Sequence, residues 1–146
     1  MQGENYNYIF QELIRLSLKR AVLICGGTEI DEDTISTKLS DPNIKEAVRG
    51  YDEKIKSFVT GLPLDEIRNV LVIKYIGTDY LYCVYPDEYY KTNSPAKIYR
   101  KMQKSKRFRD RDMYYENIKE RCCNHIMQSY TLHDELVTGL KILRFI

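Results

Sequence analysis

The sequence predicts an all-α protein, a single domain of about six helices that spans residues 1–146. Its length of 146 residues suits one domain with a sizeable core. Apolar residues recur at spacings of three and four, with capping residues and prolines at the starts of these segments and glycines at their ends. The β-prone stretch Tyr80–Tyr85 has no second convincing strand to pair with. We therefore expect an ordered loop or a short helix there.

The first helix is expected to span Asn7–Ile24. Its apolar residues recur at helical spacing along one wide face, which comprises Ile9, Phe10, Leu13, Ile14, Leu16, Val22 and Leu23. Gly26 and Gly27 follow, as is typical of a helix C-terminus. An acidic linker comes next, with room for one short helix.

Asp41 and Pro42 predict the start of a second long helix. Aspartate caps a helix N-terminus, and proline suits its first turn because the missing N–H has no intrahelical partner there. The apolar residues that follow define the cleanest amphipathic pattern in the chain, and Gly61 is expected to end it.

A third long helix is expected to open at Pro63 and to end before Gly77. Apolar residues surround it almost completely, which is typical of a helix at the centre of a core. We expect the helices that begin at Pro42 and Lys106 to pack against it.

The C-terminal half is expected to contain three helices. Ser94, followed by proline, starts a short one, and a break at residues 103–105 leads into a long helix from about Lys106 to Tyr130. A last helix begins near Thr131, because Thr131 and Asp134 have the spacing of a capping box.

Positive charge is concentrated in the window Lys97–Arg111. This window contains eight basic residues and one acidic residue, a net charge of +7 in a chain whose net charge is +2. Such a patch attracts polyanions, because neutralised phosphates release their condensed counterions. The candidate nucleic-acid-binding residues are Lys97, Arg100, Lys101, Lys104, Lys106, Arg107, Arg109 and Arg111.

Two helices around a tight break, with basic residues at the start of the second, match the requirements of a helix-turn-helix. It would span about residues 94–115. The second helix would offer Arg107 and Arg109 to base edges of double-stranded DNA, while the first helix would contact phosphates. Palindromic sites would require a homodimer. The expected dimer surface is formed by the terminal helices, with Leu136, Leu140 and Leu143.

The order of these segments also resembles a known arrangement. Residues 54–76, KIKSFVTGLPLDEIRNVLVIKYI, resemble the supporting helix before the helix-turn-helix of sigma-factor region-4-like proteins. The spacing of Ile98, Tyr99, Met102 and Ser105 resembles that of ArpU-type phage transcriptional regulators. Residues 77–93 are longer than the connection in that family, and residue 103 is glutamine where glycine is usual. The resemblance covers about residues 54–130 and implies a DNA-binding transcription regulator from a phage or mobile element of a Gram-positive host.

Two other interpretations of the basic window stay open. It could be a solvated face that the acidic segment Glu29–Asp33 neutralises. It could also belong to a non-enzymatic viral or phage interaction module that binds and modulates a host protein through an acidic surface of that protein. In that case Tyr80–Tyr90 is the better candidate for a binding hot spot, because tyrosine is enriched at such positions.

No pattern in the sequence predicts an enzyme, a catalytic residue, a cofactor or a metal site. Cys122 and Cys123 are adjacent, whereas zinc ligands usually occur as pairs two to four residues apart.

No apolar run approaches the roughly 20 residues that cross a bilayer. The N-terminus also lacks the basic and apolar segments of a secretion signal. We therefore expect a cytoplasmic protein that does not contact membranes.

Overall fold

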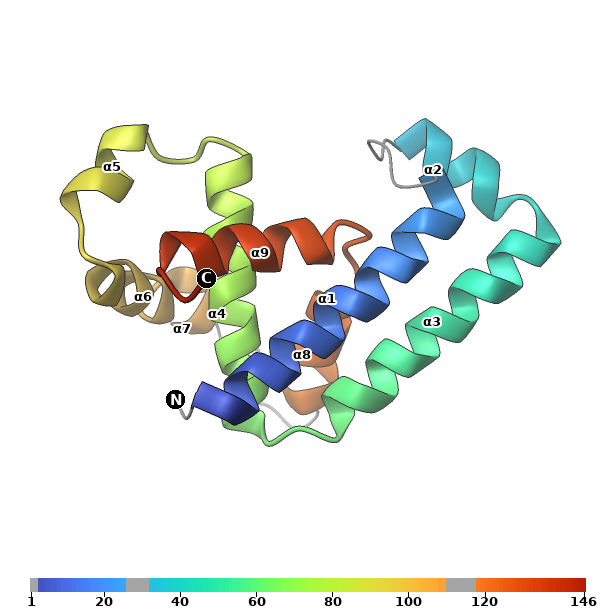
Figure 1. Cartoon of the computed structure of the whole chain (residues 1–146), viewed down its shortest axis with the longest axis horizontal. Coiled ribbons are helices and arrows are strands. Elements are labelled where there is room, and N and C mark those ends of the chain that lie inside the picture. Colours follow the sequence, from blue (N-terminus) through green and yellow to red (C-terminus); the bar gives the residue numbers. More distant parts are fainter. Residues whose placement is uncertain (1–2, 26–31, 110–117) are drawn as a thin grey trace.

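The computed structural model describes residues 3–25, 32–109 and 118–146, and every regular element in these ranges is a helix (Figure 1). Within them the structure places nine helices: α1 (Gly3–Cys25), α2 (Glu32–Leu39), α3 (Pro42–Thr60), α4 (Leu64–Leu81), α5 (Asp87–Thr92), α6 (Pro95–Gln103), α7 (Lys106–Arg109), α8 (Ile118–Met127) and α9 (Leu132–Ile142). The all-α prediction is confirmed. None of these helices has the length and apolar character that a bilayer-spanning segment requires.

The predicted number of about six helices is too low for the described residues. The acidic linker contains α2, and α5 overlaps the end of the tyrosine-rich segment Tyr80–Tyr90. The long helix predicted from Lys106 to Tyr130 is represented by α7 and α8, and the intervening residues 110–117 lie outside those described. The short helices α2 and α5 lack the long apolar periodicity by which a helix is recognised in a sequence.

The predicted starts of α3 and α6 are confirmed by their caps. The Asp41 carboxylate accepts a hydrogen bond from the backbone N–H of Asn43 at 2.9 Å. The Ser94 hydroxyl accepts one from the backbone N–H of Lys97 at 3.2 Å. Gly61 ends α3 as predicted. These termini depend on local side-chain chemistry, so the sequence pattern locates them well.

Gly77 does not end α4, which continues to Leu81. The glycine instead allows α4 and α9 to cross at very short distance. A Cβ atom at Gly77 would lie 1.8 Å from the carbonyl oxygen of Glu135, and a Cβ at Gly139 would lie 2.2 Å from the carbonyl oxygen of Ile73. Two helix backbones are therefore in direct contact where each lacks a side chain.

The central position of α4 is confirmed, but its main partner is α9. Buried residues lie on several sides of α4 and include Ile67, Val70, Leu71, Val72, Ile73 and Ile76. Helices α8 and α6 also pack on α4, whereas α3 packs mainly on α1 and α8 (Figure 1). The expectation that the helices from Pro42 and Lys106 enclose α4 is therefore wrong for α3. An amphipathic pattern shows that a helix has a buried face, without showing which helix covers it.

The proposed dimer surface on α9 is buried within the monomer. Leu136, Leu140 and Leu143 belong to the same core as α4, and Leu136 has no exposed surface. These leucines are covered because α9 packs on both α4 and α1. The apolar stripe of α9 thus stabilises the fold of one chain, and the prediction that it forms a homodimer contact is wrong.

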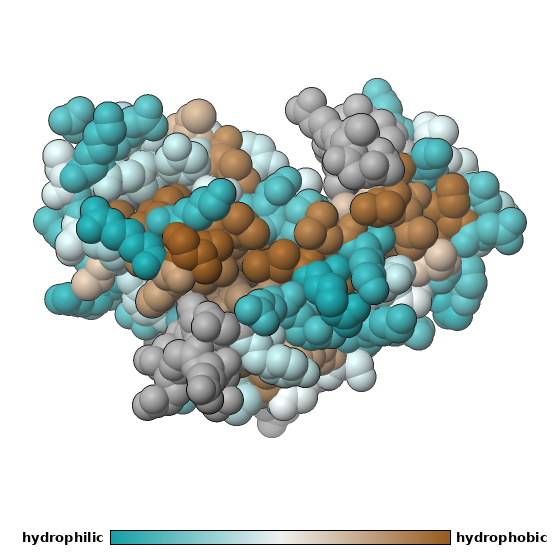
Figure 2. Space-filling model, viewed as in Figure 1, coloured by the Kyte–Doolittle hydropathy of each residue, from teal (hydrophilic) through white to brown (hydrophobic). Residues whose placement is uncertain are grey.

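The buried face of α1 differs in register from the predicted one. Ile9, Phe10, Leu13 and Leu16 are buried as expected. Farther along, however, the buried positions are Ser17, Arg20, Ala21 and Ile24, and Val22 is 51% exposed. Figure 2 shows a band of apolar side chains across the visible surface of the molecule. The exposed apolar residues of α1 and the C-terminus include Leu18, Val22, Phe145 and Ile146. Two polar residues of α1 are thus buried in place of the predicted aliphatic one.

Arg20 is fully buried and connects three parts of the chain. Its guanidinium donates to Asp52 Oδ1 of α3 at 2.8 Å. It also donates to the carbonyl oxygens of Met127 at 3.2 Å and Ser129 at 2.6 Å, which terminate α8 and lead into α9. The Tyr130 ring lies 4.9 Å from the guanidinium carbon. Arg20 therefore holds α1, α3 and the α8–α9 connection together.

Ser17 caps α9 from a distant part of the chain. Its hydroxyl oxygen accepts a hydrogen bond from the backbone N–H of His133 at 3.0 Å and lies 3.0 Å from His133 Nδ1. Thr131, the predicted cap, makes no side-chain hydrogen bond to the helix and instead contacts the Ser129 hydroxyl. A tertiary contact thus performs the capping that the local sequence pattern assigns to Thr131.

Acidification is expected to destabilise the fold through His133. Burial lowers the pKa of His133, and the charge of Arg20 acts in the same direction against the opposite effects of Asp134 and Glu135. The unfolded chain therefore binds a proton at a higher pH than the folded protein does, so the free energy of unfolding falls as the pH drops from about 7 through the ordinary histidine pKa. Urea unfolding at several pH values should show this fall in the wild type and a flatter profile in His133→Gln.

The exposed His125 supplies the matched control for this titration. His125→Gln is expected to keep the pH profile of the wild type. Equal profiles for His133→Gln and the wild type would contradict a role of His133 in the acid sensitivity.

Candidate functional site

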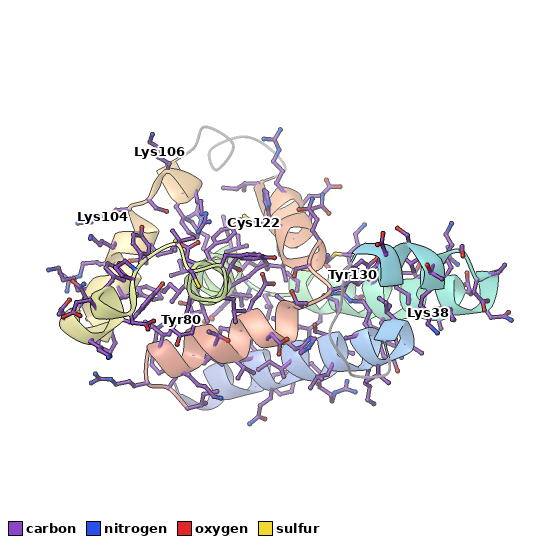
Figure 3. The ribbon with its side chains drawn as sticks, turned by 90° about the horizontal axis from the view of Figure 1, so that it is seen from above. Lys38, Tyr80, Lys104, Lys106, Cys122 and Tyr130 are labelled. Carbon is purple, nitrogen blue, oxygen red and sulfur yellow. The ribbon has the colours of Figure 1, made fainter. Side chains whose placement is uncertain are left out.

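The described basic residues of the predicted site lie on α6, on α7 and in the turn between them. Six of these side chains are exposed, and five of the six form no ion pair with a described carboxylate: Lys97, Arg100, Lys101, Lys104 and Lys106. Figure 3 shows Lys104 and Lys106 at the outer edge of the molecule. The side chain of Arg109 and the whole of Arg111 lie outside the described residues. The five cations that form no such ion pair are called the basic face below.

The apolar side of α6 determines where the basic face points. Ile98 and Met102, one helical turn apart, are buried in the core that contains α4. The half-buried Tyr99 donates a hydrogen bond from its hydroxyl to Asn69 Oδ1 of α4. Because these three contacts fix the rotation of α6, its lysines and arginine are directed toward solvent. The sequence predicted this division of α6 correctly.

Arg107 is engaged within the protein, although the sequence predicts it as a leading exposed residue of a recognition helix. Its guanidinium forms an ion pair with Asp79 Oδ1 at 2.9 Å, and its side chain is 41% exposed. The guanidinium carbon also lies 4.7 Å from the centre of the Tyr75 ring, which Phe108 contacts edge-on. Arg107 therefore attaches α7 to α4, and the basic face is formed without it.

A cleft of about 950 Å³ separates the basic face from the tyrosine-rich segment. Its apolar lining comes from Ile76, Ile98 and Met102, and its aromatic lining from Tyr85, Tyr89 and Tyr90. All five cations of the basic face line it as well. Sequence reasoning assigns the basic window and the segment Tyr80–Tyr90 to alternative functions, but described residues of both line the same cleft.

The tyrosines form a continuous aromatic cluster. Tyr85 and Tyr89 stack with ring centres 4.3 Å apart and an interplanar angle of 19°. Tyr90 meets Tyr89 and Tyr80 edge-on, with ring centres 5.0 and 5.1 Å apart. Lys101 Nζ lies 5.1 Å from the centre of the Tyr89 ring and joins the cluster to the basic face. This cation–π contact stabilises the pairing of α5 with α6.

The Tyr90 hydroxyl is buried and has no hydrogen-bond partner in the described residues. Burial raises the pKa of Tyr90 to about 12, and the nearby charge of Asp79 adds to the effect. The phenol therefore stays protonated at neutral pH and is available as a hydrogen-bond donor. A buried polar group without a partner is uncommon in proteins.

The helix-turn-helix stays a prediction. The break between α6 and α7 falls at residues 104–105, as expected. Of the second helix, however, the structure describes only the four residues Lys106–Arg109, and the predicted remainder to residue 115 lies in the range 110–117, outside the described residues.

The described part of the acidic segment Glu29–Asp33 lies too far from the basic face to neutralise it. Residues 29–31 lie outside the described ranges, and Asp33 lies on α2. Helix α2 and the basic helices α6 and α7 lie at opposite ends of the long axis of the molecule (Figure 1). At such a separation, salt screens the attraction between exposed charges.

The two cysteines of α8 pack in the hydrophobic core. Cys122 and Cys123 are both buried, and burial raises the pKa of each thiol, which favours the unreactive protonated form. Within residues 3–25, 32–109 and 118–146, no group of three or more histidine, cysteine or carboxylate side chains is placed to hold a metal ion.

In the comparisons, no protein-family model, no curated protein and no solved structure matches this chain.

Proposed function

We propose that this protein is a non-enzymatic DNA-binding regulator that contacts double-stranded DNA through the basic face. The observation that carries the proposal is the set of five exposed cations on α6, in the turn after it and at the start of α7, which form no ion pairs with described carboxylates. Cations held on one surface of a folded helix pair bind phosphates without first breaking internal ion pairs. The sequence resemblance to ArpU-type regulators extends the proposal to transcription control in a phage or mobile element.

Helix α6 would supply contacts to phosphates, because its cations are directed outward by the burial of Ile98 and Met102. Lys106 begins α7, whose N-terminal end would approach the duplex in a helix-turn-helix. Asp79 and Tyr75 fix α7 through Arg107, so the two helices would approach DNA as one preformed unit.

Reversing three charges of the basic face is expected to weaken DNA binding and to reduce its salt dependence. In the variant Lys101→Glu, Lys104→Glu, Lys106→Glu, three phosphate contacts are lost, and each contributes about one unit to the slope of log K against log salt. The slope should therefore fall by about 3. Fluorescence anisotropy of a labelled mixed-sequence duplex, measured across a salt series, gives both the affinity and the slope.

A matched control has the same change in net charge on α2 and α3, away from α6 and α7 (Figure 1). Lys38, Lys45 and Lys56 are exposed on α2 and α3, and Figure 3 shows Lys38 far from Lys104. Their triple replacement by glutamate is expected to keep most of the affinity. Equal losses in the two triple variants would mean that only net charge matters, and no binding by the folded wild type at low salt would contradict the proposal.

The second candidate is an interaction module that binds an acidic surface of a host protein. It is favoured by the exposed apolar and aromatic residues that continue from the cleft, notably Tyr82 at 76% exposure and Val84 at 55%. A partner retained from nuclease-treated host lysate by the wild type but not by Tyr82→Ala would favour this candidate. A partner lost on nuclease treatment would favour nucleic acid.

A further inference from the structure

The cleft beside the basic face has the dimensions of a ligand site. Its volume of about 950 Å³ lies within the range of about 300–1,000 Å³ that is usual for such sites. It is formed by the end of α4, the connection to α5, α5 itself and α6 with the start of α7. Apolar surface at the base and a small number of polar groups at the rim are the usual combination for binding an organic ligand.

One wall offers a stacking surface for a flat ring. Tyr85 stacks on Tyr89, whose ring is contacted by Lys101 and Tyr90, so the position of Tyr85 is fixed by packing. Tyr85 itself remains 42% exposed. Stacking of a nucleobase on such a ring is tolerant of base identity, because every base has a π face.

The cleft also offers cations to an anionic group. Lys97, Lys101 and Lys104 line the cleft together with Arg100 and Lys106. Among the described residues that line it, Asp79 is the only carboxylate, and Arg107 is paired with it. The cleft is therefore lined both by aromatic rings and by several cations.

We propose that this cleft binds a nucleoside phosphate unit, with its base on Tyr85 and its phosphate on the lysines of α6. Tyr90 also lines the cleft, and its buried hydroxyl has no hydrogen-bond partner among the described residues. The inference deepens the proposed function, because the same lysines would hold phosphate in both cases. Tyr85, however, has no role in contacts to duplex phosphates, so the cleft proposal and the proposed function can be tested separately.

Two sources could supply this chemistry: a free nucleotide, or an unpaired nucleotide of a single strand. A duplex is a poor source, because its bases are stacked on one another and would have to be extruded before reaching Tyr85. We therefore expect the cleft to bind a single strand more tightly than a duplex, whereas the exposed basic face can contact the phosphates of both.

The test measures binding of a fluorescein-labelled oligothymidylate of about 12 nucleotides, a length within the usual range for single-strand sites. The same strand annealed to its complement provides the duplex, and thymidine 5′-monophosphate serves as a competitor. The variants are Tyr85→Ala, Tyr85→Phe and Tyr82→Ala. Tyr82 is the matched control, because it is a neighbouring exposed tyrosine outside the cleft lining.

Loss of one base–aromatic stack predicts that Tyr85→Ala weakens binding of the single strand about 5- to 100-fold. Tyr85→Phe and Tyr82→Ala should bind like the wild type, and the duplex should be affected much less than the single strand by any of the three. Competition by the monophosphate would show that a free nucleotide suffices, and competition by strands alone would assign the unpaired nucleotide of a strand. Circular dichroism verifies that each variant is folded.

These experiments distinguish a failure of the cleft proposal from a failure of the proposed function. If Tyr85→Ala binds the single strand like the wild type while the lysine variant loses the duplex, the cleft proposal is overturned and the proposed function stands. If Tyr85→Ala loses the single strand and the wild type does not bind duplex, the cleft proposal stands and the proposed function is overturned. A similar loss in Tyr82→Ala and Tyr85→Ala would also overturn the cleft proposal.

Discussion

Arg20→Ala is expected to destabilise the protein by about 3 kcal/mol or more, with loss of cooperative packing between α1, α3 and the α8–α9 connection. The substitution leaves the carbonyl oxygens of Met127 and Ser129 without their donor and opens a cavity beside Tyr130. Asp52 also loses its partner, but it is one-third exposed and regains water. The cost thus arises mainly from the partly buried carbonyls that lose their donor and from the lost packing.

Urea unfolding followed by circular dichroism measures this effect. Arg15→Ala is the matched control on the same helix, because Arg15 is exposed and pairs with Glu12 at the surface. Its midpoint should stay close to that of the wild type. Arg20→Lys keeps the charge but cannot reach three acceptors in the same fork geometry, so an intermediate midpoint is expected. Equal midpoints for Arg20→Ala and Arg15→Ala would exclude a clamping role for Arg20.

Gly139→Ala is expected to destabilise the protein by about 1–3 kcal/mol or more, because the new methyl group has no space at the crossing of α4 and α9. Its Cβ would lie 2.2 Å from the Ile73 carbonyl oxygen, and the obstacle is backbone, which does not move aside as a flexible side chain would. Gly77→Ala should have a similar effect, since its Cβ would lie 1.8 Å from the Glu135 carbonyl oxygen. Separating the helices would also loosen the core around Leu136.

Gly50→Ala provides a control of opposite sign. Gly50 lies in the interior of α3, and a Cβ there meets nothing within 4 Å. Alanine has the higher helix propensity, so this variant should be more stable by about 0.5–1 kcal/mol. Thermal unfolding of the three variants compares them directly. A gain in stability from Gly139→Ala would mean that the helices do not cross at this glycine.

Local chemistry explains where sequence reasoning succeeded. Asp41 and Ser94 cap their helices through hydrogen bonds to amides two and three residues away, so each motif contains its own partner. The outward direction of the basic residues on α6 follows equally from the positions of Ile98 and Met102 in the same short helix. The all-α class and the location of the exposed cations could therefore be predicted.

Gly77 and Arg20 show why other features of the fold could not be predicted from the sequence. Gly77 has the same local pattern whether it ends a helix or faces another backbone, and only the approach of α9 distinguishes the two. Arg20 reads as a surface residue, because burial of arginine depends on acceptors that lie 32 to 109 positions away in the sequence. Leu136 and Leu140 signal a buried face equally well for a core and for a dimer.

The sequence by itself determined that this chain is helical, where α3 and α6 begin, and that its positive charge faces outward from α6. Those properties depend on neighbours within one or two helical turns. Tertiary structure decided that α9 packs inside the monomer, that Arg107 belongs to the interface with α4, and that Tyr85 and Lys101 line one cleft. These depend on contacts between distant segments, and a periodic pattern specifies which face of a helix is covered without specifying by what.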